Sequence, residues 1–121
     1  MITHRFNKET GILEAKASEV IGIADIIHHY RQLSENTLYP FSLRVLIDCR
    51  GTRIDVSPDE IAQTHAAVKK AISRYTHIRE AILVDEPHGT VVAALFQSSY
   101  YDLKQYSFMI FSTMDAALSW L

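Results

Sequence analysis

Apolar and polar residues alternate near the start of the chain, and this alternation predicts a β-hairpin. Leu13, Ala15 and Ala17 are each followed by a polar residue, which is the period of a strand with one buried face. Gly11 supplies a turn between this run and residues 2–10. We therefore expect two antiparallel strands at the N-terminus.

The clearest helical pattern lies in residues 57–75. Ser57 is a good N-cap, Pro58 suits the first turn, and Glu60 completes a capping box with Ser57. The residues expected on the buried stripe of this helix are Ile61, His65, Val68, Ile72 and Tyr75.

Two further segments have the same helical character. Residues 22–33 place isoleucines and a tyrosine at the spacing of one helix face, with Gly22 as the candidate cap. Residues 90–101 form an apolar run after Gly89 and predict a helix that begins near Thr90.

Three β-rich apolar runs alternate with these helices, at residues 41–48, 78–85 and 106–111. Strands that are joined by helical crossovers pair in parallel, and the helices then cover the faces of the sheet. The sequence thus predicts an α/β fold in the order ββαβαβαβα. Its mixed sheet has an antiparallel N-terminal hairpin and parallel central strands.

The end of the chain has the pattern of a short amphipathic helix. Ser112 and Asp115 have the spacing of a capping box. The apolar residues at helical spacing are Met114, Ala117, Leu118 and Leu121. We expect this helix to dock on the sheet with Trp120 as a core anchor; an exposed aromatic that binds a partner is the alternative.

Composition narrows the class of protein. A chain of 121 residues, 48% of them hydrophobic, predicts one domain over residues 1–121. The net charge of −2 and the mixed distribution of charge predict neither a nucleic-acid partner nor a membrane-surface segment. Cys49 is the only cysteine, and the first residues lack a signal-peptide core, so we expect a cytoplasmic protein.

Candidate chemistry gathers where two predicted parallel strands end. Asp48 and Asp85 are the last residues of their strands, and ligands in open α/β sheets bind beyond the carboxyl ends of strands. The complete candidate ligand site is Asp48, Arg50, Gly51, Asp85, His88 and Gly89. Two carboxylates and a histidine suit metal binding or acid–base work; the alternative is that they only cap loops. No fixed ligand spacing is present, so the sequence predicts no metal site, cofactor or catalytic residue.

Other reactive side chains have structural explanations. His28 and His29 are adjacent, so they cannot form an i, i+4 metal clamp, and we expect a solvated helix face. His65 lies in an apolar stripe and predicts a core or boundary imidazole. Cys49 follows a buried strand and predicts an inert thiol. Of Tyr100 and Tyr101, one is expected to pack and the other to serve an interface.

The order of these segments resembles the STAS/SpoIIAA-like family, in particular its small stand-alone bacterial members. The segments that carry the resemblance are GILEAKASEVIGIADIIHH, VLIDCRG with the helix capped by Ser57, REAILVDEPHGTVVAALF, and FMIFSTMDAALSWL. The resemblance covers nearly the whole chain and implies a SpoIIAA-like fold. It concerns pattern and order, and none of these segments is a catalytic signature.

The resemblance also implies a kind of function. Relatives of this type are regulatory interaction modules, some of which are switched by phosphorylation of a serine between a strand and a helix. Here the corresponding passage, DCRGTRIDVSPDE, is longer and offers only Ser57. We therefore expect a non-enzymatic interaction or regulatory module with a protein partner, or a homodimer. The related Sec14-type fold implies the alternative, a carrier or sensor of a small apolar, lipid-like ligand between sheet and helices.

Overall fold

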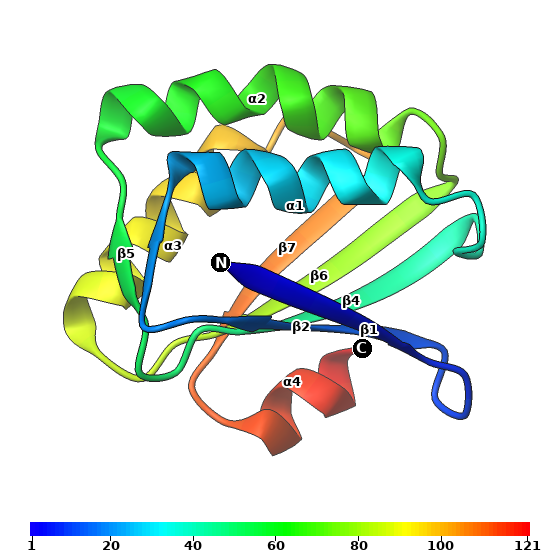
Figure 1. Cartoon of the computed structure of the whole chain (residues 1–121), viewed down its shortest axis with the longest axis horizontal. Coiled ribbons are helices and arrows are strands. Elements are labelled where there is room, and N and C mark those ends of the chain that lie inside the picture. The colour runs from blue at the N-terminus through cyan, green and yellow to red at the C-terminus, as the bar shows by residue number, and fades with distance from the viewer.

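A five-stranded mixed sheet forms the centre of the molecule (Figure 1), and the computed structural model describes all 121 residues. The strands, in spatial order, are β1 (Ile2–Asn7), β2 (Ile12–Ala17), β4 (Ser42–Asp48), β6 (His77–Leu83) and β7 (Tyr106–Phe111). β1 and β2 pair antiparallel, and the other neighbours pair parallel. The predicted α/β class, the hairpin and the parallel central strands are confirmed.

The two faces of the sheet are covered unequally. Three helices lie on one face: α1 (Ile23–Glu35), α2 (Pro58–Ile72) and α3 (Pro87–Ser99). The short helix α4 (Met114–Trp120) lies alone on the other face (Figure 1). None of the four helices has the length and hydropathy needed to span a lipid bilayer.

Two short strands were not predicted from the sequence. β3 (Val20–Gly22) and β5 (Arg53–Asp55) form a separate parallel pair. Each contributes one buried residue to the core, Ile21 and Ile54. Strands this short carry no readable period, because a single buried side chain does not establish an alternation.

The helix starts follow the local capping chemistry. In α2 the Ser57 hydroxyl accepts the amide N–H of Glu60, and the Glu60 carboxylate accepts that of Ser57, as the capping-box pattern predicts. In α1 the Gly22 amide donates to the Asp25 carboxylate at 3.0 Å. The cap of α4 is Thr113, whose hydroxyl accepts from the Ala116 amide, so the prediction of Ser112 is wrong by one residue.

The main core lies between the sheet and helices α1–α3 and contains 29 buried residues. The α2 stripe is buried as expected except at His65, which is half-exposed and lies 3.2 Å from the Asp102 carboxylate. Thr64 is buried in its place, and its hydroxyl bonds both to the Ile61 carbonyl and to Tyr100. The helix is thus rotated slightly from the orientation that apolar residues alone predict.

A second, smaller cluster lies under α4. Ala117 is fully buried there against Leu46 and Leu83 of the sheet. Trp120 is only half-buried: its ring lies 5.7 Å from that of Phe111, and the Arg79 guanidinium lies 4.6 Å above it. The predicted docking of the terminal helix is confirmed, but Trp120 packs at the rim of this cluster and is not the deep anchor expected.

Candidate functional site

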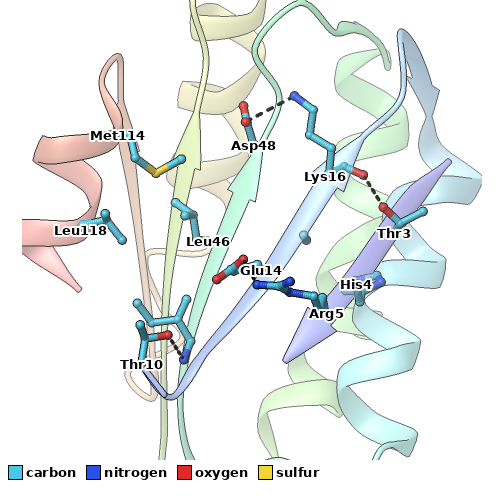
Figure 2. A pocket seen from close by; sticks show the side chains of 12 residues that line it. Thr3, His4, Arg5, Thr10, Glu14, Lys16, Leu46, Asp48, Met114 and Leu118 are labelled. Carbon is cyan, nitrogen blue, oxygen red and sulfur yellow. Dashed lines mark hydrogen bonds and ion pairs between the residues drawn. The ribbon is translucent and has the colours of Figure 1, made fainter. Parts of the chain in front are cut away.

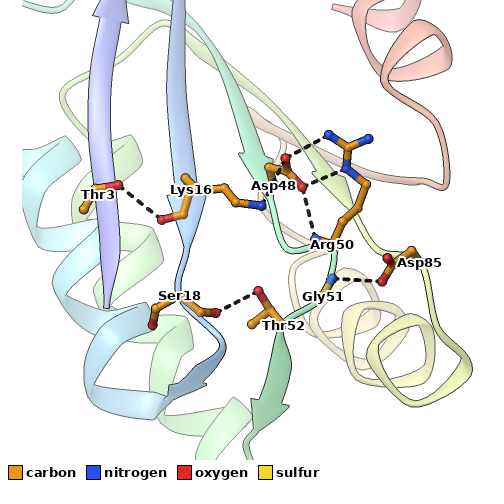
Figure 3. Close-up of polar contacts among 8 residues, drawn as sticks. All are labelled: Thr3, Lys16, Ser18, Asp48, Arg50, Gly51, Thr52 and Asp85. Carbon is orange, nitrogen blue, oxygen red and sulfur yellow. Dashed lines mark hydrogen bonds and ion pairs between the residues drawn. The ribbon is translucent and has the colours of Figure 1, made fainter.

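Asp48 lies at the carboxyl end of β4 and is held by its own neighbours (Figure 3). Arg50 donates to both carboxylate oxygens from Nε and Nη2, each at 3.0 Å, and Lys16 Nζ lies 3.3 Å away. Hydrogen bonds from Arg50 hold the pKa of Asp48 at about 2. This carboxylate is a paired structural anion, and its oxygens are already engaged.

Asp85 and Gly51 join the loops that follow β6 and β4. The Gly51 amide donates to Asp85 Oδ1 at 3.1 Å (Figure 3). Gly51 has φ +74°, a left-handed conformation that favours glycine and turns its amide. The structure thus brings Asp48, Arg50, Gly51 and Asp85 to one edge of the sheet, as predicted. This is the edge at which the parallel strands reach their carboxyl ends.

His88 and Gly89 lie beside the same edge, in the first turn of α3. This helix begins at Pro87 rather than near Thr90, because the Glu86 side chain accepts the amides of His88 and Gly89 and so caps it. These two amides are therefore not free to bind an anion at this edge. Their acceptor is a carboxylate supplied by the chain itself.

An open depression of about 520 Å³ lies at this edge of the sheet. Its lining residues are Gly51, Thr52, Arg53, Asp85, Glu86 and His88. No group of three or more histidine, cysteine, aspartate or glutamate side chains is gathered closely enough to hold a metal ion. The edge therefore combines mutually satisfied loops with one exposed histidine, and no nucleophile lies beside a base.

Ser57 is exposed at the start of α2, and its hydroxyl is used by the capping box. A phosphate at a helix N-terminus is favoured by the helix dipole. Here it would stand next to the carboxylates of Asp59 and Glu60 in the first turn, which repel it. Phosphorylation of Ser57 stays a prediction, and the geometry gives this serine a structural role.

The interior between the sheet and the helices leaves little free space. An apolar cavity there has a volume of about 30 Å³, roughly the space of one water molecule. Ile47, Phe96 and Cys49 are among its lining residues. A lipid-like ligand needs hundreds of Å³, so this packed core weighs against a carrier.

The thiol of Cys49 is buried in this region, in line with the inert side chain that the sequence predicts. Burial, together with the nearby charges of Asp48 and Glu80, raises the pKa of Cys49 to about 12. A thiol in this state is protonated at neutral pH and is a poor nucleophile.

Sequence reasoning missed a polar chain inside the core. His29 and Glu80 are each only 1% exposed, and their side chains meet at 2.9 Å. His4 Nε2 lies 2.7 Å from His29 Nδ1, and the Tyr106 hydroxyl donates to the other Glu80 oxygen. The Tyr30 hydroxyl bonds to that of Tyr106 at 2.9 Å. The expected solvated histidine face is thus correct for exposed His28 and wrong for His29.

This polar chain changes the titration of its members. Burial, together with the neighbouring His29, lowers the pKa of His4 to about 4. Burial and the Glu80 charge raise the pKa of Tyr30 and Tyr106. A signal was present in the sequence, since Glu80 lies between Ile78 and Ile82 on the same face of β6, where an acidic residue needs a buried partner.

A groove of about 590 Å³ lies on the other face of the sheet, between α4 and the hairpin (Figure 2). Leu46, Met114 and Leu118 form its apolar wall. The charged side chains opposite are already paired, Arg5 with Glu14 at 3.5 Å and Lys16 with Asp48 at 3.3 Å. The groove is the solvated face of the hairpin and carries no unpaired charge for a ligand.

The side of the molecule made by α3 and β7 contains no charged residue. Neither element includes an aspartate, glutamate, lysine or arginine. Val91 and Leu95 are 59% and 41% exposed one turn apart on α3, and Met109 is 39% exposed on β7. Tyr101, just beyond α3, is exposed, whereas Tyr100 is buried, so the expected division between these tyrosines agrees with the structure.

No family model matches the chain, and no curated protein or solved structure matches it either. Function is therefore argued from the geometry of this molecule and from the pattern of its sequence.

Proposed function

We propose that this chain is a small, non-enzymatic protein-interaction module of regulatory type, acting in the cytoplasm and binding its partner through the α3/β7 side. The observation that carries the proposal is the uncharged exposed face of α3, with Val91 and Leu95 open to solvent. The cores of protein interfaces are depleted of charge and rich in apolar side chains. The resemblance to STAS/SpoIIAA-like regulators supports the same function.

Composition sets this side apart from the rest of the surface. Charged residues make up 21% of the chain, yet the 13 residues of α3 and the 6 of β7 contain none. A surface helix normally carries charged or polar residues opposite its buried stripe. The exposed apolar stripe of α3 is therefore unusual for a helix face that contacts only solvent.

Two further exposed apolar residues form a weaker candidate. Leu38 and Phe41 are exposed in the loop between α1 and β4. The Arg74 guanidinium lies 6.0 Å from the centre of the Phe41 ring, so a cation already covers part of this loop. This loop would present only two apolar side chains to a partner, whereas α3 and β7 would present a whole helix and a whole strand.

The test is site-specific photo-crosslinking in the cells that make the protein. A photoreactive benzoylphenylalanine replaces Val91, and in a matched control it replaces Leu38, which is 88% exposed but lies in the α1–β4 loop. We expect a discrete protein adduct from position 91 only, and we expect Leu95→Lys to abolish it. An absence of adducts at position 91, or the same adducts from both positions, contradicts the proposal.

A further inference from the structure

We infer that the occupant of the α3/β7 side is a second copy of this chain, joined through antiparallel pairing of β7 with its two-fold mate. This inference rests on the proposed function, because it assigns a partner to the same surface. The sheet would then continue across the two-fold axis, with five strands from each copy. The two-fold axis stands perpendicular to the sheet, so both α3 helices lie on the same face of the joint sheet.

The hydrogen-bond pattern of β7 identifies the groups available for pairing. The carbonyls of Gln105 and Phe111 accept from Ile78 and Val84, on and just after β6. Strand alternation therefore points the amides and carbonyls of Phe108 and Ile110 away from β6, towards the outer edge. β7 is the last strand of the sheet, so this edge has no neighbouring strand within the molecule.

One side chain already covers part of this edge. Gln97 of α3 donates from Nε2 to the Phe108 carbonyl at 2.9 Å. A carbonyl oxygen has two lone pairs and can accept a second donor. Both the amide and the carbonyl of Ile110 stay open for a partner strand.

The register follows from the two-fold symmetry. Residues that face each other across an antiparallel pair point to the same side of the sheet, so a symmetric pairing is centred on a single residue. Centring on Met109 lets Phe108 exchange hydrogen bonds with Ile110 of the second copy. It also sets the Phe108 ring beside the β-branched Ile110 side chain, a favourable cross-strand pair.

The opposite edge of the sheet shows why β7 is the strand that pairs. β1 carries Arg5 and is followed by Lys8, and a two-fold pairing of β1 centred on Arg5 would bring the Arg5 side chains of the two copies together. Charged side chains are a common device by which edge strands avoid self-pairing. β7, with the sequence YSFMIF, carries no such charge, and an uncharged surface meets its own copy without repulsion.

Sedimentation velocity over a wide range of loading concentrations tests the inference. We expect a concentration-dependent dimer for the natural chain. Met109→Lys sets two like charges against each other on the axis and raises the dimer dissociation constant by about tenfold or more. The matched control is Leu118→Lys, a residue of similar exposure on the same sheet face but away from the edge, and it leaves the dimer unchanged.

A disulfide trap tests the register. Met109 and its mate form a non-hydrogen-bonded pair, with Cα atoms about 4.5 Å apart, which lies in the range of a disulfide. Met109→Cys therefore cross-links the two copies under mild oxidation, whereas Leu118→Cys does not. The natural Cys49 is buried and does not compete.

The outcomes separate the two proposals. A natural chain that stays monomeric at every concentration overturns the inference, as does a dimer in which Met109→Cys fails to cross-link. In either case an adduct of position 91 with a different protein still supports the interaction module. Failure of the proposed function is instead the absence of any adduct specific to position 91.

Discussion

His29 Nε2 lies 2.9 Å from Glu80 Oε2, and the fold buries both side chains completely between α1 and the centre of β6. An acid and an imidazole in a core of apolar residues are tolerated because each supplies the other's hydrogen bond. Tyr106 satisfies the second Glu80 oxygen, and His4 satisfies the second nitrogen of His29. This arrangement links β1, α1, β6 and β7 through polar side chains.

Removing Glu80 is expected to destabilise the protein strongly. Glu80→Ala leaves His29 and Tyr106 buried without their acceptor, and breaking a buried pair from one side costs about 3–5 kcal/mol. Urea unfolding followed by circular dichroism measures the loss. Glu14→Ala is the control, because its pair with Arg5 is solvent-exposed and is worth about 0–1 kcal/mol. Equal effects of the two substitutions would contradict the burial argument.

The free energy of unfolding should decrease as the pH is lowered, over a range set by the titration of His4. Its folded-state pKa of about 4 lies below the ordinary histidine pKa of 6.5, so the unfolded chain takes up the proton first. The contribution of His4 is therefore present above pH 6.5 and is lost as the pH falls to about 4.

The variant that isolates this effect is His4→Gln. It cannot titrate in this window, so its urea midpoint should change less between pH 7 and pH 4.5 than that of the natural chain. The titratable groups near His4, namely His28, His29 and Glu80, stay in place in this variant. The same pH dependence in both proteins would show that His4 is not the titrating group.

The capping box at Ser57 predicts that different substitutions of this serine lower the stability of the protein by different amounts. Ser57→Ala loses the acceptor for the Glu60 amide and costs about 0.5–2 kcal/mol. Ser57→Asp should be nearly neutral, because aspartate also caps helices and suits the dipole. Thermal unfolding measures both, and mass spectrometry of protein from its own cells reports phosphate at Ser57. A phosphate found there would assign a switch to this position.

The half-buried Trp120 predicts an intermediate loss of stability. A fully buried tryptophan costs about 3–5 kcal/mol when it is replaced by alanine, and the partial exposure of Trp120 reduces this to about 1–3 kcal/mol. Leu118→Ala on the same helix should cost less, about 1 kcal/mol or below, because Leu118 is smaller than Trp120 and is 45% exposed. Similar losses for both residues would contradict the packing seen under α4.

The first turn of α3 predicts how the strand-end edge responds to anions. In the natural chain Glu86 occupies the amides of His88 and Gly89, so sulfate should leave their NMR signals unmoved. Glu86→Ala frees these amides at a helix N-terminus, and sulfate should then shift them. Shifts at residues 48–51 and 85–90 of the natural chain would instead support a ligand site at this edge.

The helices and strands that could be predicted are those whose signals are local in the chain. Alternation identified the hairpin, and apolar runs identified the central strands, because strand period and burial are readable within a few residues. The capping box at Ser57 marked the start of α2 for the same reason. The sequence also predicted that Asp48, Gly51 and Asp85 lie at one edge of the sheet, since parallel strands end together.

The contacts between polar groups could not be predicted, because they depend on how distant segments pack. His29 and Glu80 lie 51 positions apart in the chain, so no local pattern pairs them, and the helix period alone left His29 in solvent. The Glu86 carboxylate accepts hydrogen bonds from the first amides of α3, and this depends on a side-chain rotamer that sequence spacing does not specify. The exposure of Val91, Leu95 and Met109 likewise depends on which helix covers which strand. The elements follow from neighbours along the chain, whereas the surface and the buried polar chain follow from contacts between distant residues.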